Sequence, residues 1–460
     1  MERRDFVKTA ATAAAVGPFP GTVLGANDRI VIGQIGLGSR GYYETTIISR
    51  NNGVDLAAVC DAFQPLASMT KQKVGGKTEA YTDFRRVLER KDIDAIFVST
   101  PDHWHAPMAI MACQAGKDVY CEKPLSHTVE EGRRMVQAAR KYNRIFQVGS
   151  QQRSAPHFAK CAELVQSGYI GEVSDIDCWI VSNEYPVGFG DVPNSAPPNG
   201  LDWDLYLGPA PKAPYNRNRY IWNWRWFWDY SGGNMTDWGA HHLDSIHQIM
   251  NVTAPKSVSA TGGRMIRDNR DTPDNFLATF EYPGFTVRFA NSQVGMRMDR
   301  YAGTIFYGTR GTLFVDRKGY QVIPSKFSAI VRSDVDQVQE MLASRRREVT
   351  GEKRPPAPST INPPLCEAVE VTGLSLDPEI QIVHVQNFLD AVKSRQRPFA
   401  DVEVGHTSIV PCHLGNIAYR TGRTIRWDAQ NEEIVGDPDA AAQLSKQYRP
   451  PWSLPTPAGL

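Results

Sequence analysis

The sequence lacks an excess of charge of either sign. Lysine and arginine together number 51 and aspartate and glutamate 50 in a chain of 460 residues, so the formal net charge is +1. The one notable basic run, Arg345 to Arg347, is short and sits in a polar stretch. Binding to nucleic acid or to an anionic membrane surface depends on a concentrated basic patch. We therefore expect neither as a partner.

Cysteine is scarce and scattered. There are seven cysteines, an odd number, and no Cys-x-x-Cys or Cys/His cluster. A disulfide framework needs paired cysteines, and a structural zinc site needs clustered ligands. Cys60 and Cys121 lie within apolar runs and fit small core residues better. The sequence thus predicts no disulfide framework and no structural metal.

A hydrophobic run long enough to span a membrane is also missing near the N-terminus. The apolar stretch Thr9 to Val16 is too short for a permanent anchor. It follows Arg3-Arg4-Asp5-Phe6-Val7-Lys8, which resembles a twin-arginine export signal. We therefore expect residues 1–26 to be a signal peptide and the folded protein to be exported to the periplasm without a membrane anchor. The alternative is a basic N-terminus on a cytoplasmic enzyme.

The glycine pattern that follows is typical of a dinucleotide-binding turn. An apolar run leads directly into Gly36-x-Gly38-x-x-Gly41 and then into a helical pattern. The first glycine permits a tight turn, the second lets a pyrophosphate approach the backbone, and the third lets the helix pack closely on the sheet. Asp61 ends the next apolar run, twenty residues after Gly41. Because an acidic residue there accepts ribose hydroxyls and repels a 2′-phosphate, NAD is favoured over NADP.

The remaining pattern predicts two domains, as the length also suggests. Strands and helices alternate over residues 28–150, which predicts an α/β Rossmann dinucleotide-binding domain with a parallel sheet. Short strands joined by tight turns then predict an α+β C-terminal domain, residues 151–430, with an open and mainly antiparallel sheet. Residues 334–364, charged and then proline-rich, indicate an insertion or a long surface loop. Residues 431–460 are expected to form an extended tail.

Polar residues follow neighbouring strands of the predicted parallel sheet. Thr100 and Pro101 follow one strand and Lys123 the next, at the edge where open α/β sheets bind ligands. A lysine there can hold a substrate hydroxyl while its proton is removed. Asp237 and His241 are four residues apart in a predicted helix, residues 236–250, so they share a face and can form a proton acceptor near the lysine. A divalent-metal site formed by this pair with His242 and His247 is the alternative.

Tryptophan recurs at every second position in residues 222–228. If this segment is a strand, the indoles lie on one face, where they could stack on a sugar ring, with Arg225 binding hydroxyls or an acidic group. An aromatic core cluster is an equally good interpretation.

With these motifs the chain resembles the glucose-fructose oxidoreductase/inositol dehydrogenase (Gfo/Idh/MocA) family. The motifs on which this resemblance rests are the glycine turn, Cys121-Glu122-Lys123-Pro124-Leu125 and the Asp237-x-x-x-His241 pair. Residues 201–209 and 414–420 also resemble a Tat-exported bacterial branch. The resemblance assigns catalysis to Lys123, Asp237 and His241, with His241 as the general base. The expected cofactor-binding residues are Gly36, Gly38, Ser39, Arg40, Gly41, Asp61, Thr100, Pro101, His105, Glu122 and Lys123. The expected substrate-binding residues are Trp104, Arg153, Trp224, Arg225 and His242.

Export restricts the function that this resemblance implies. Free NAD is not expected outside the cytoplasm, so the cofactor must stay bound and be restored in each turnover. A sugar oxidoreductase that hands the hydride to a second sugar meets this demand. So does an NAD-dependent glycoside hydrolase or lyase that oxidises a sugar transiently and eliminates the glycosidic group. Since the exported glycosidase branch lacks Glu-Lys-Pro, which this chain has, the oxidoreductase is favoured.

A third interpretation is a non-catalytic sugar-binding protein on a dehydrogenase scaffold. The presence of Gly36, Asp61, Lys123, Asp237 and His241 together argues against it. The resemblance and the predicted open sheet also favour a homodimer or homotetramer.

Overall fold

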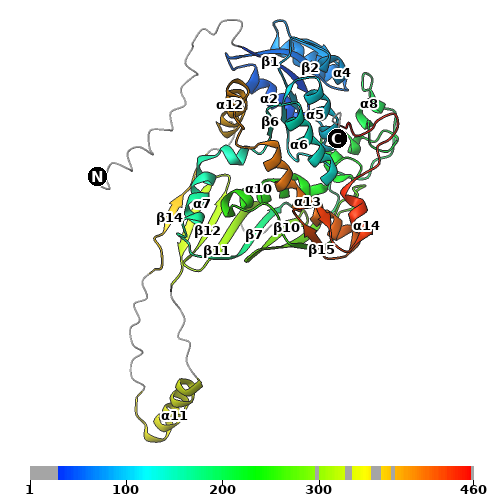
Figure 1. Cartoon of the computed structure of the whole chain (residues 1–460). Helices are drawn as coiled ribbons and strands as arrows, with labels where there is room; N and C mark the ends of the chain where they lie inside the picture. Colours follow the sequence, from blue (N-terminus) through cyan, green and yellow to red (C-terminus); the bar gives the residue numbers. More distant parts are fainter. Residues whose placement is uncertain (1–28, 296–299, 327–333, 354–363, 375–378, 457–460) are drawn as a thin grey trace, which may run out of the picture.

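A computed structural model describes residues 29–295, 300–326, 334–353, 364–374 and 379–456. The predicted signal peptide, residues 1–26, lies outside the described residues. Figure 1 shows a smaller sheet with flanking helices above a larger sheet, with further helices between them. Among the described residues, no helix has the length and apolarity needed to cross a membrane.

The N-terminal sheet confirms the predicted Rossmann fold. Its six strands run in the order β3-β2-β1-β4-β5-β6, and every pair is parallel. The strands are β1 (Ile30–Ile35), β2 (Val54–Cys60), β3 (Glu79–Tyr81), β4 (Ala95–Val98), β5 (Asp118–Cys121) and β6 (Phe146–Val148). All residues of β4 and β5 are buried because helices cover both faces of the sheet. The strand order reverses between β1 and β4, where ligands bind in this type of sheet.

Helices of the N-terminal domain follow the strands in turn. They are α2 (Ser39–Ile48), α3 (Gln64–Val74), α4 (Phe84–Leu88), α5 (His105–Gln114) and α6 (Val129–Lys141), with short 3₁₀ turns η2 (Asp102–Trp104) and η3 (Gln151–Ser154). The sequence determines the start of α6 locally. Thr128 and Glu131 form a reciprocal capping box there, each side chain accepting the other residue's backbone N–H.

The C-terminal sheet is open and mixed, with mostly antiparallel pairs, as predicted. Its ten strands run in the order β14-β13-β12-β11-β7-β10-β9-β8-β15-β16, and only β7 and β10 pair in parallel among the described strands. The strands are β7 (Val173–Val181), β8 (Ser257–Gly263), β9 (Asn275–Tyr282), β10 (Phe285–Ser292), β11 (Ala302–Gly308), β12 (Gly311–Asp316), β13 (Gly319–Pro324), β14 (Val369–Val371), β15 (Ile425–Asp428) and β16 (Glu433–Ile434). In β9 buried and solvent-accessible residues alternate, so one face of the sheet is covered.

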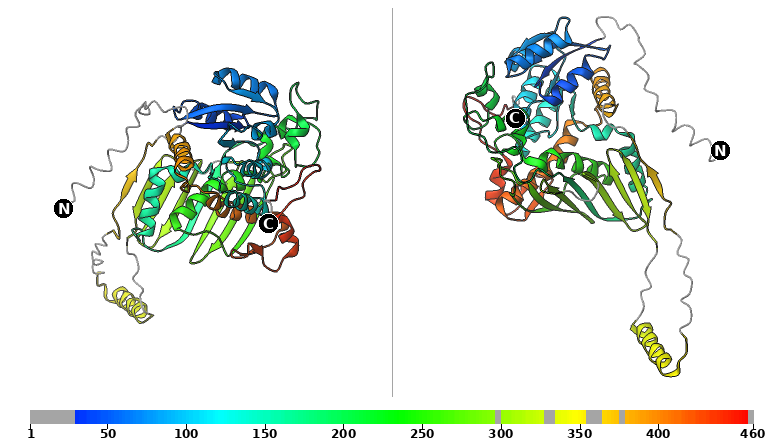
Figure 2. Two further views of the ribbon diagram at one scale, coloured as in Figure 1. Left: turned by 45° about the horizontal axis from the view of Figure 1, so that its top comes forward. Right: turned by 180° about the vertical axis from the view of Figure 1, so that it is seen from behind.

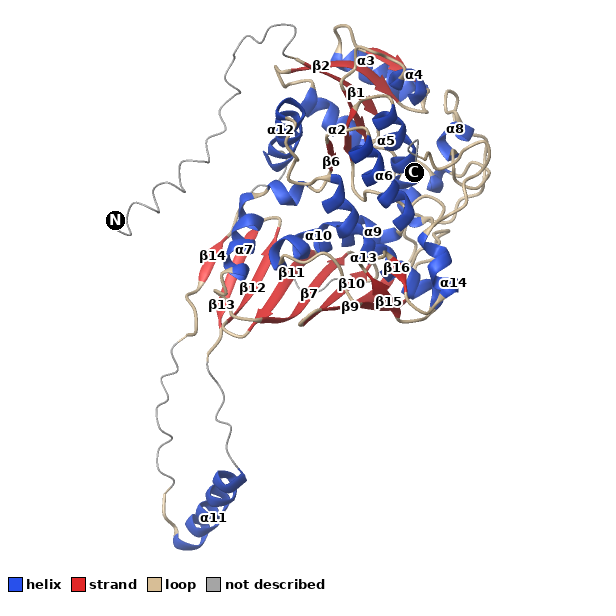
Figure 3. Cartoon of the chain, viewed as in Figure 1, coloured by secondary structure: helices blue, strands red, loops and turns tan. Residues whose placement is uncertain are grey.

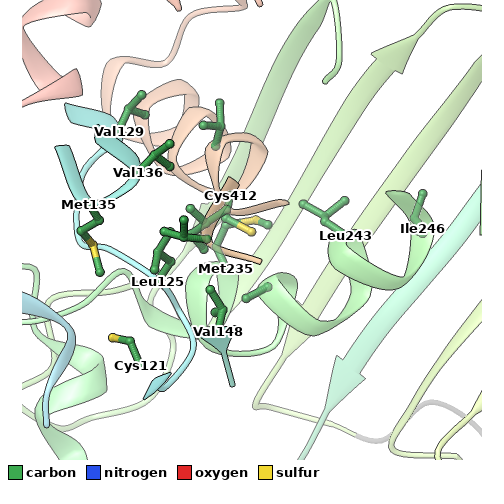
Figure 4. Close-up of a cluster of buried hydrophobic side chains, with 14 of the residues drawn as sticks. Cys121, Leu125, Val129, Met135, Val136, Val148, Met235, Leu243, Ile246 and Cys412 are labelled. Carbon is green, nitrogen blue, oxygen red and sulfur yellow. The ribbon is translucent and has the colours of Figure 1, made fainter. Parts of the chain in front are cut away.

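The covering helices lie between the two sheets (Figure 3). They are α7 (Pro156–Gln166), α9 (Gly233–Asp237), α10 (Gly239–Met250) and α13 (Val402–Thr421). Figure 4 shows where α6, α10 and α13 meet, with Leu125, Val136, Leu243 and Cys412 in one buried cluster. Because this core is continuous between the two domains, the cleft at their junction has a fixed frame.

A helix late in the chain completes the N-terminal domain. Helix α12 (Glu379–Ser394) packs Val385, Phe388 and Leu389 into the same buried cluster as Ile30 and Tyr120 (Figures 1 and 2). The sequence reading did not predict this helix, although its apolar residues recur at helical spacing.

Several local predictions were wrong. Residues 236–250 do not form one helix, since the chain breaks at Trp238 between α9 and α10. Residues 334–364, predicted to be an insertion or a long surface loop, contain α11 (Asp334–Thr350), so only the loop interpretation is wrong. The tryptophan-rich segment is not a strand: it includes the 3₁₀ turn η5 (Asn223–Trp226), which buries Trp224 and Trp226 and leaves Trp222 exposed. The tail includes β16 and α14 (Pro438–Ala441) before it becomes extended.

Candidate active site

The turn between β1 and α2 has the shape that a pyrophosphate requires. Gly36 has a φ of +87°, and an added Cβ would lie 2.5 Å from the Ser99 carbonyl oxygen. A Cβ on Gly41 would lie 1.9 Å from the Gly36 oxygen, so only glycine permits this approach. At Gly38, by contrast, no atom lies within 4 Å of an added Cβ. Gly38 caps α2 without a side-chain hydrogen bond, which leaves N–H groups of the first turn for an anion.

Asp61 follows β2 at the same edge of the sheet. Its carboxylate accepts the Leu37 N–H at 2.8 Å and the Phe63 N–H at 2.9 Å. Burial raises the pKa of Asp61, and these two hydrogen bonds oppose that effect. A carboxylate has about four acceptor positions, so Asp61 can also accept the hydroxyls of a ribose.

These residues line one cleft of about 830 Å³. The predicted cofactor residues on its wall are Gly36, Gly38, Ser39, Arg40, Asp61, Thr100 and Pro101. The opposite wall comes from the segment that precedes α9, through Tyr206, Tyr220, Trp222, Trp224 and Arg225. We call this segment, residues 200–225, the roof. A glycine turn, an acidic strand end and a cleft between them together fit a bound NAD molecule.

The roof is attached to the chain directly after Asp61. The Gln64 N–H donates to the Gly200 carbonyl and the Asp202 N–H to the Ala62 carbonyl, both at 2.9 Å. Farther along the roof, Trp104 donates its indole N–H to the Tyr206 carbonyl at 3.0 Å. The roof therefore extends along the cleft from the acidic strand end to the carboxyl end of β4.

Lys123 and Asp237 form a close ion pair beside Arg225, which is one of the residues that line the cleft. Neither Lys123 nor Asp237 lines the cleft itself. Lys123 Nζ lies 2.5 Å from Asp237 Oδ1 and also donates to the Asp237 carbonyl at 3.1 Å. Arg225 Nε lies 3.4 Å from the same carboxylate oxygen, and its guanidinium is over the Trp222 and Trp224 rings. Burial alone would raise the pKa of Asp237, but the charges of Lys123 and Arg225 outweigh it and lower the pKa to about 2. The carboxylate is thus charged at neutral pH and fixes the ammonium group.

His241 lies in the first turn of α10, beyond the break at Trp238. The imidazole is buried, and both burial and the nearby charge of Lys123 lower its pKa. It is therefore neutral at pH 7 and able to accept a proton. The break at Trp238 means that Asp237 and His241 do not share one helix face, although both lie near Lys123.

Arg40 connects the glycine turn to the Glu-Lys-Pro motif. Its Nε lies 2.9 Å from Glu122 and 3.4 Å from Glu44, and its Nη2 donates to Gln381 of α12 at 2.6 Å. Burial and the charge of Glu122 raise the pKa of Glu44, whereas Arg40 outweighs burial and lowers the pKa of Glu122. Glu122 also accepts the Lys123 N–H at 3.1 Å. Arg40 thus joins the phosphate end of the cleft to the backbone of Lys123.

Some predicted site residues do not line the cleft, or have polar groups that are already bonded to other residues of the protein. His105 does not line it: its ring nitrogens are hydrogen-bonded to the carbonyls of Pro124 at 2.8 Å and Thr100 at 3.0 Å. Trp104 lines the cleft but is 2% exposed and holds the roof through its N–H. Arg153 is ion-paired with Asp244 at 2.7 Å.

His242 lies in a separate pocket beside the C-terminal sheet. Its Nδ1 is 3.0 Å from the Thr304 hydroxyl, and the pocket also contains Gln152, Trp238 and Arg317. The metal site considered from the sequence does not assemble, because His247 bonds instead to the Tyr282 hydroxyl at 2.7 Å. Within the described part of the chain, no group of three or more His, Cys, Asp or Glu side chains is placed to hold a metal ion.

Sequence reasoning missed part of the cleft wall. Tyr206 and Tyr220 lie in a segment without clear periodicity, and only its richness in aromatic residues marked it. Glu44 and Gln381, which fix Arg40, carried no motif at all.

A parallel Rossmann sheet with a glycine turn, an acidic strand end and a cleft between them is typical of NAD-binding oxidoreductases. Two family models match this chain. The oxidoreductase family, NAD-binding Rossmann fold, matches residues 30–150, and the C-terminal alpha/beta domain of the same family matches residues 169–272 and 369–454. The chain belongs to the Gfo/Idh/MocA oxidoreductase family.

Curated relatives are similar over part of their length. The alpha-N-acetylgalactosaminidase of Shewanella oneidensis is 34% identical over 162 residues, which cover 28% of this chain and 35% of the relative. Glycosyl hydrolase family 109 protein 1 of Shewanella sp. MR-4 is 32% identical over 30% of this chain and 37% of the relative. The uncharacterized oxidoreductase YrbE of Bacillus subtilis is 37% identical over 31% of this chain and 42% of the relative. These matches span about two fifths or less of each relative.

Solved structures share the fold over nearly their whole length. A levoglucosan dehydrogenase in complex with NADH and levoglucosan superposes with a TM-score of 0.61 at 17% identity, covering 86% of this chain and 99% of that one. The WlbA dehydrogenase of Bordetella pertussis, in complex with NADH and UDP-GlcNAcA, has a TM-score of 0.61 at 16% identity, covering 87% and 99%. At these identities the likeness establishes the fold alone.

Proposed function

We propose that this protein is an NAD-dependent oxidoreductase that oxidises a secondary alcohol of a sugar, a cyclitol or a sugar derivative. The observation that carries the proposal is the Lys123–Asp237 pair, 2.5 Å apart and in contact with Arg225 of the cleft wall, with the neutral His241 nearby. NAD, when bound, supplies a hydride acceptor. Lys123 donates a hydrogen bond to the substrate hydroxyl and stabilises its developing negative charge, while His241 accepts the proton. Asp237 holds Lys123 in place and takes no proton, since its pKa is about 2.

We further propose that the cofactor stays bound between turnovers. The roof covers the cleft and is hydrogen-bonded to the residues on either side of Phe63, whose ring meets Tyr220 edge to face with centroids 6.3 Å apart. An aromatic pair of this kind is worth about 0.5–1.5 kcal/mol. Tyr220→Ala is therefore expected to speed NAD release by up to about tenfold.

The release experiment uses the holoprotein and labelled NAD. Exchange of the bound nucleotide is followed for the native protein, for Tyr220→Ala, and for Val187→Ala, an exposed residue before the roof, as a matched control. Faster exchange in Tyr220→Ala alone supports retention by the roof. Equal exchange in all three, or fast exchange in the native protein, rejects it.

Mass spectrometry of the denatured protein tests the oxidoreductase proposal directly. NAD or NADH released at near-equal stoichiometry supports a retained cofactor, and sugar pairs are then assayed without added nucleotide. Lack of nucleotide together with sugar binding would favour a non-catalytic sugar-binding protein.

The identity to glycosyl hydrolase family 109 proteins favours one second candidate, an NAD-dependent glycoside hydrolase or lyase. Transient oxidation of a sugar carbon acidifies the neighbouring C–H, so the glycosidic group leaves by elimination, water adds and the hydride returns. Turnover of a glycoside in D₂O separates the two candidates. Cleavage with deuterium at the carbon beside the oxidised one indicates elimination, and oxidation without cleavage indicates the dehydrogenase.

We also propose that the protein is exported folded through the twin-arginine pathway and forms a homodimer or homotetramer. Arg3-Arg4 before a short apolar run supports export. Arg3→Lys combined with Arg4→Lys is expected to keep the protein in the cytoplasmic fraction, and unchanged localisation of this variant contradicts the proposal.

A further inference from the structure

Arg225 connects the wall of the cofactor cleft to the Lys123–Asp237 pair. It is the last residue of the roof, and it lines the cleft together with Trp222 and Trp224. Its Nε lies 3.4 Å from Asp237 Oδ1. Among the described residues that line the cleft, Arg225 alone is ion-paired with Asp237. Arg225 is thus the polar link between the cleft and the pair.

Two indole rings restrict the guanidinium group of Arg225. Its Cζ lies 4.6 Å from the centre of the Trp222 ring and 4.3 Å from the centre of the Trp224 ring. Nη1 also donates to the Trp222 carbonyl oxygen at 3.1 Å. A planar guanidinium stacked in this way has few orientations, so its direction follows the position of the roof.

The same part of the roof has surface that a bound nucleotide can cover. Trp222 lines the cleft and is 55% exposed, whereas Trp224 is buried and donates its indole N–H to the Ile221 carbonyl at 3.0 Å. Covering the exposed indole removes apolar area from water, which favours its packing against the ligand. Occupancy of the cleft therefore acts on the residue that holds Arg225.

The carboxylate of Asp237 is shared by two cations. Lys123 Nζ and Arg225 Nε lie 2.5 and 3.4 Å from the same oxygen, Oδ1. The side chains of Lys123, Asp237 and Arg225 are 15%, 15% and 17% exposed, so solvent screens these contacts only partly. Because both cations bind one oxygen, the position of Arg225 affects where the carboxylate holds the Lys123 ammonium group.

We propose that Arg225 is a positioning residue that couples occupancy of the cofactor cleft to the arrangement of Lys123 and Asp237. A filled cleft fixes Trp222 and the guanidinium stacked on it, and the guanidinium fixes the carboxylate that orients Lys123. The substrate hydroxyl then meets a correctly placed lysine only when the nucleotide is present. This inference rests on the proposed function, which places Lys123 and Asp237 at the reacting hydroxyl.

Coupling between two sites is reciprocal, so it can be measured without a sugar substrate. Asp237 does not line the cleft, and its substitution is expected to act on the nucleotide through Arg225. Release of labelled NAD from the holoprotein is followed for Asp237→Asn, for Arg225→Gln and for the double variant. We expect each single substitution to speed release by about 3–10-fold, and the double variant to release NAD no faster than Arg225→Gln.

Arg219 provides a matched control. It is also a roof arginine over two aromatic rings, 4.5 Å from the centre of Phe227 and 5.7 Å from that of Tyr230. However, it is ion-paired with Asp229 at 3.0 Å and does not line the cleft. In an Arg219→Gln background, Asp237→Asn is expected to keep its full effect on release.

Unchanged release in Asp237→Asn overturns the proposal. So does an effect of Asp237→Asn that persists in the Arg225→Gln background, because Asp237 would then act on the nucleotide by another route. The measurement needs no turnover, so its failure is distinct from a failure of the proposed sugar oxidation, which Lys123→Ala tests.

Steady-state kinetics separate a positioning role from direct contact with the substrate. Arg225→Gln is expected to lower kcat by about tenfold with KM unchanged. Arg225→Lys keeps the charge without the planar group and should restore part of the lost turnover. A rise in KM with kcat unchanged would show that Arg225 binds the substrate, and would overturn the proposal.

Discussion

The charge of Asp237 should stabilise the fold as well as position Lys123. The side chain is 15% exposed, and its pKa is about 2 instead of the usual 3.8. Because each pKa unit is worth about 1.4 kcal/mol, the ionised carboxylate contributes about 2–3 kcal/mol at pH 7. Asp237→Asn removes this contribution and leaves Lys123 and Arg225 without their shared anion. We expect its free energy of unfolding to be lower by about this amount at pH 7.

The pH dependence separates this charge effect from a packing effect. A carboxyl group with a lowered pKa stabilises the fold above its unfolded pKa, and the stabilisation is lost as the pH falls through the folded pKa. The difference between native protein and Asp237→Asn in urea unfolding should therefore be complete at pH 7, shrink as the pH falls below about 5, and vanish only near about pH 1, below both pKa values. A difference that stays constant over this range would refute the argument, since asparagine has nearly the same shape but no charge.

Three further substitutions test other parts of the site. Lys123→Ala is expected to lower turnover by about 10²–10⁴ while the nucleotide content of the purified protein stays the same, and unchanged turnover contradicts the catalytic assignment. Asp61→Ala should weaken NAD binding and reduce discrimination against NADP in titrations, whereas a protein that fails to fold points to the structural bonds of its carboxylate. Arg40→Met leaves Glu44 and Glu122 buried without their cation, so urea unfolding should show a free energy of unfolding lower by about 3–5 kcal/mol. Adding Glu44→Gln should restore part of this stability. Equal stability of Arg40→Met and native protein would show that the network is not stabilising.

The parts that could be predicted from the sequence depend on short stretches of chain. Gly36 and Gly41 specify the turn because an added Cβ at either position would collide with the backbone. Gly38 leaves open space where a pyrophosphate can approach. Lys123 could be placed because a residue after a parallel strand must lie at the carboxyl edge of the sheet.

The parts that could not be predicted depend on contacts between distant segments. The roof meets the cleft through ordinary backbone hydrogen bonds of Ala62 and Gln64, which leave no pattern in the sequence. The break at Trp238 interrupts a run of residues with a good helical pattern. The prediction that Asp237 and His241 lie on one helix used that pattern alone. Gln381 reaches Arg40 across more than 300 positions, a partnership that only the fold creates.

Helix α12 has a consequence for how the chain is made. Phe388 packs against Phe97 and Tyr120, with ring centroids 5.4 and 5.8 Å away. On a ribosome, those two rings are translated long before the helix that covers them emerges. Until then the nascent Rossmann sheet has an open aromatic surface, and a fragment that ends at residue 150 would keep that surface permanently. The nucleotide-binding domain can therefore reach its final packing only when most of the polypeptide has been synthesised.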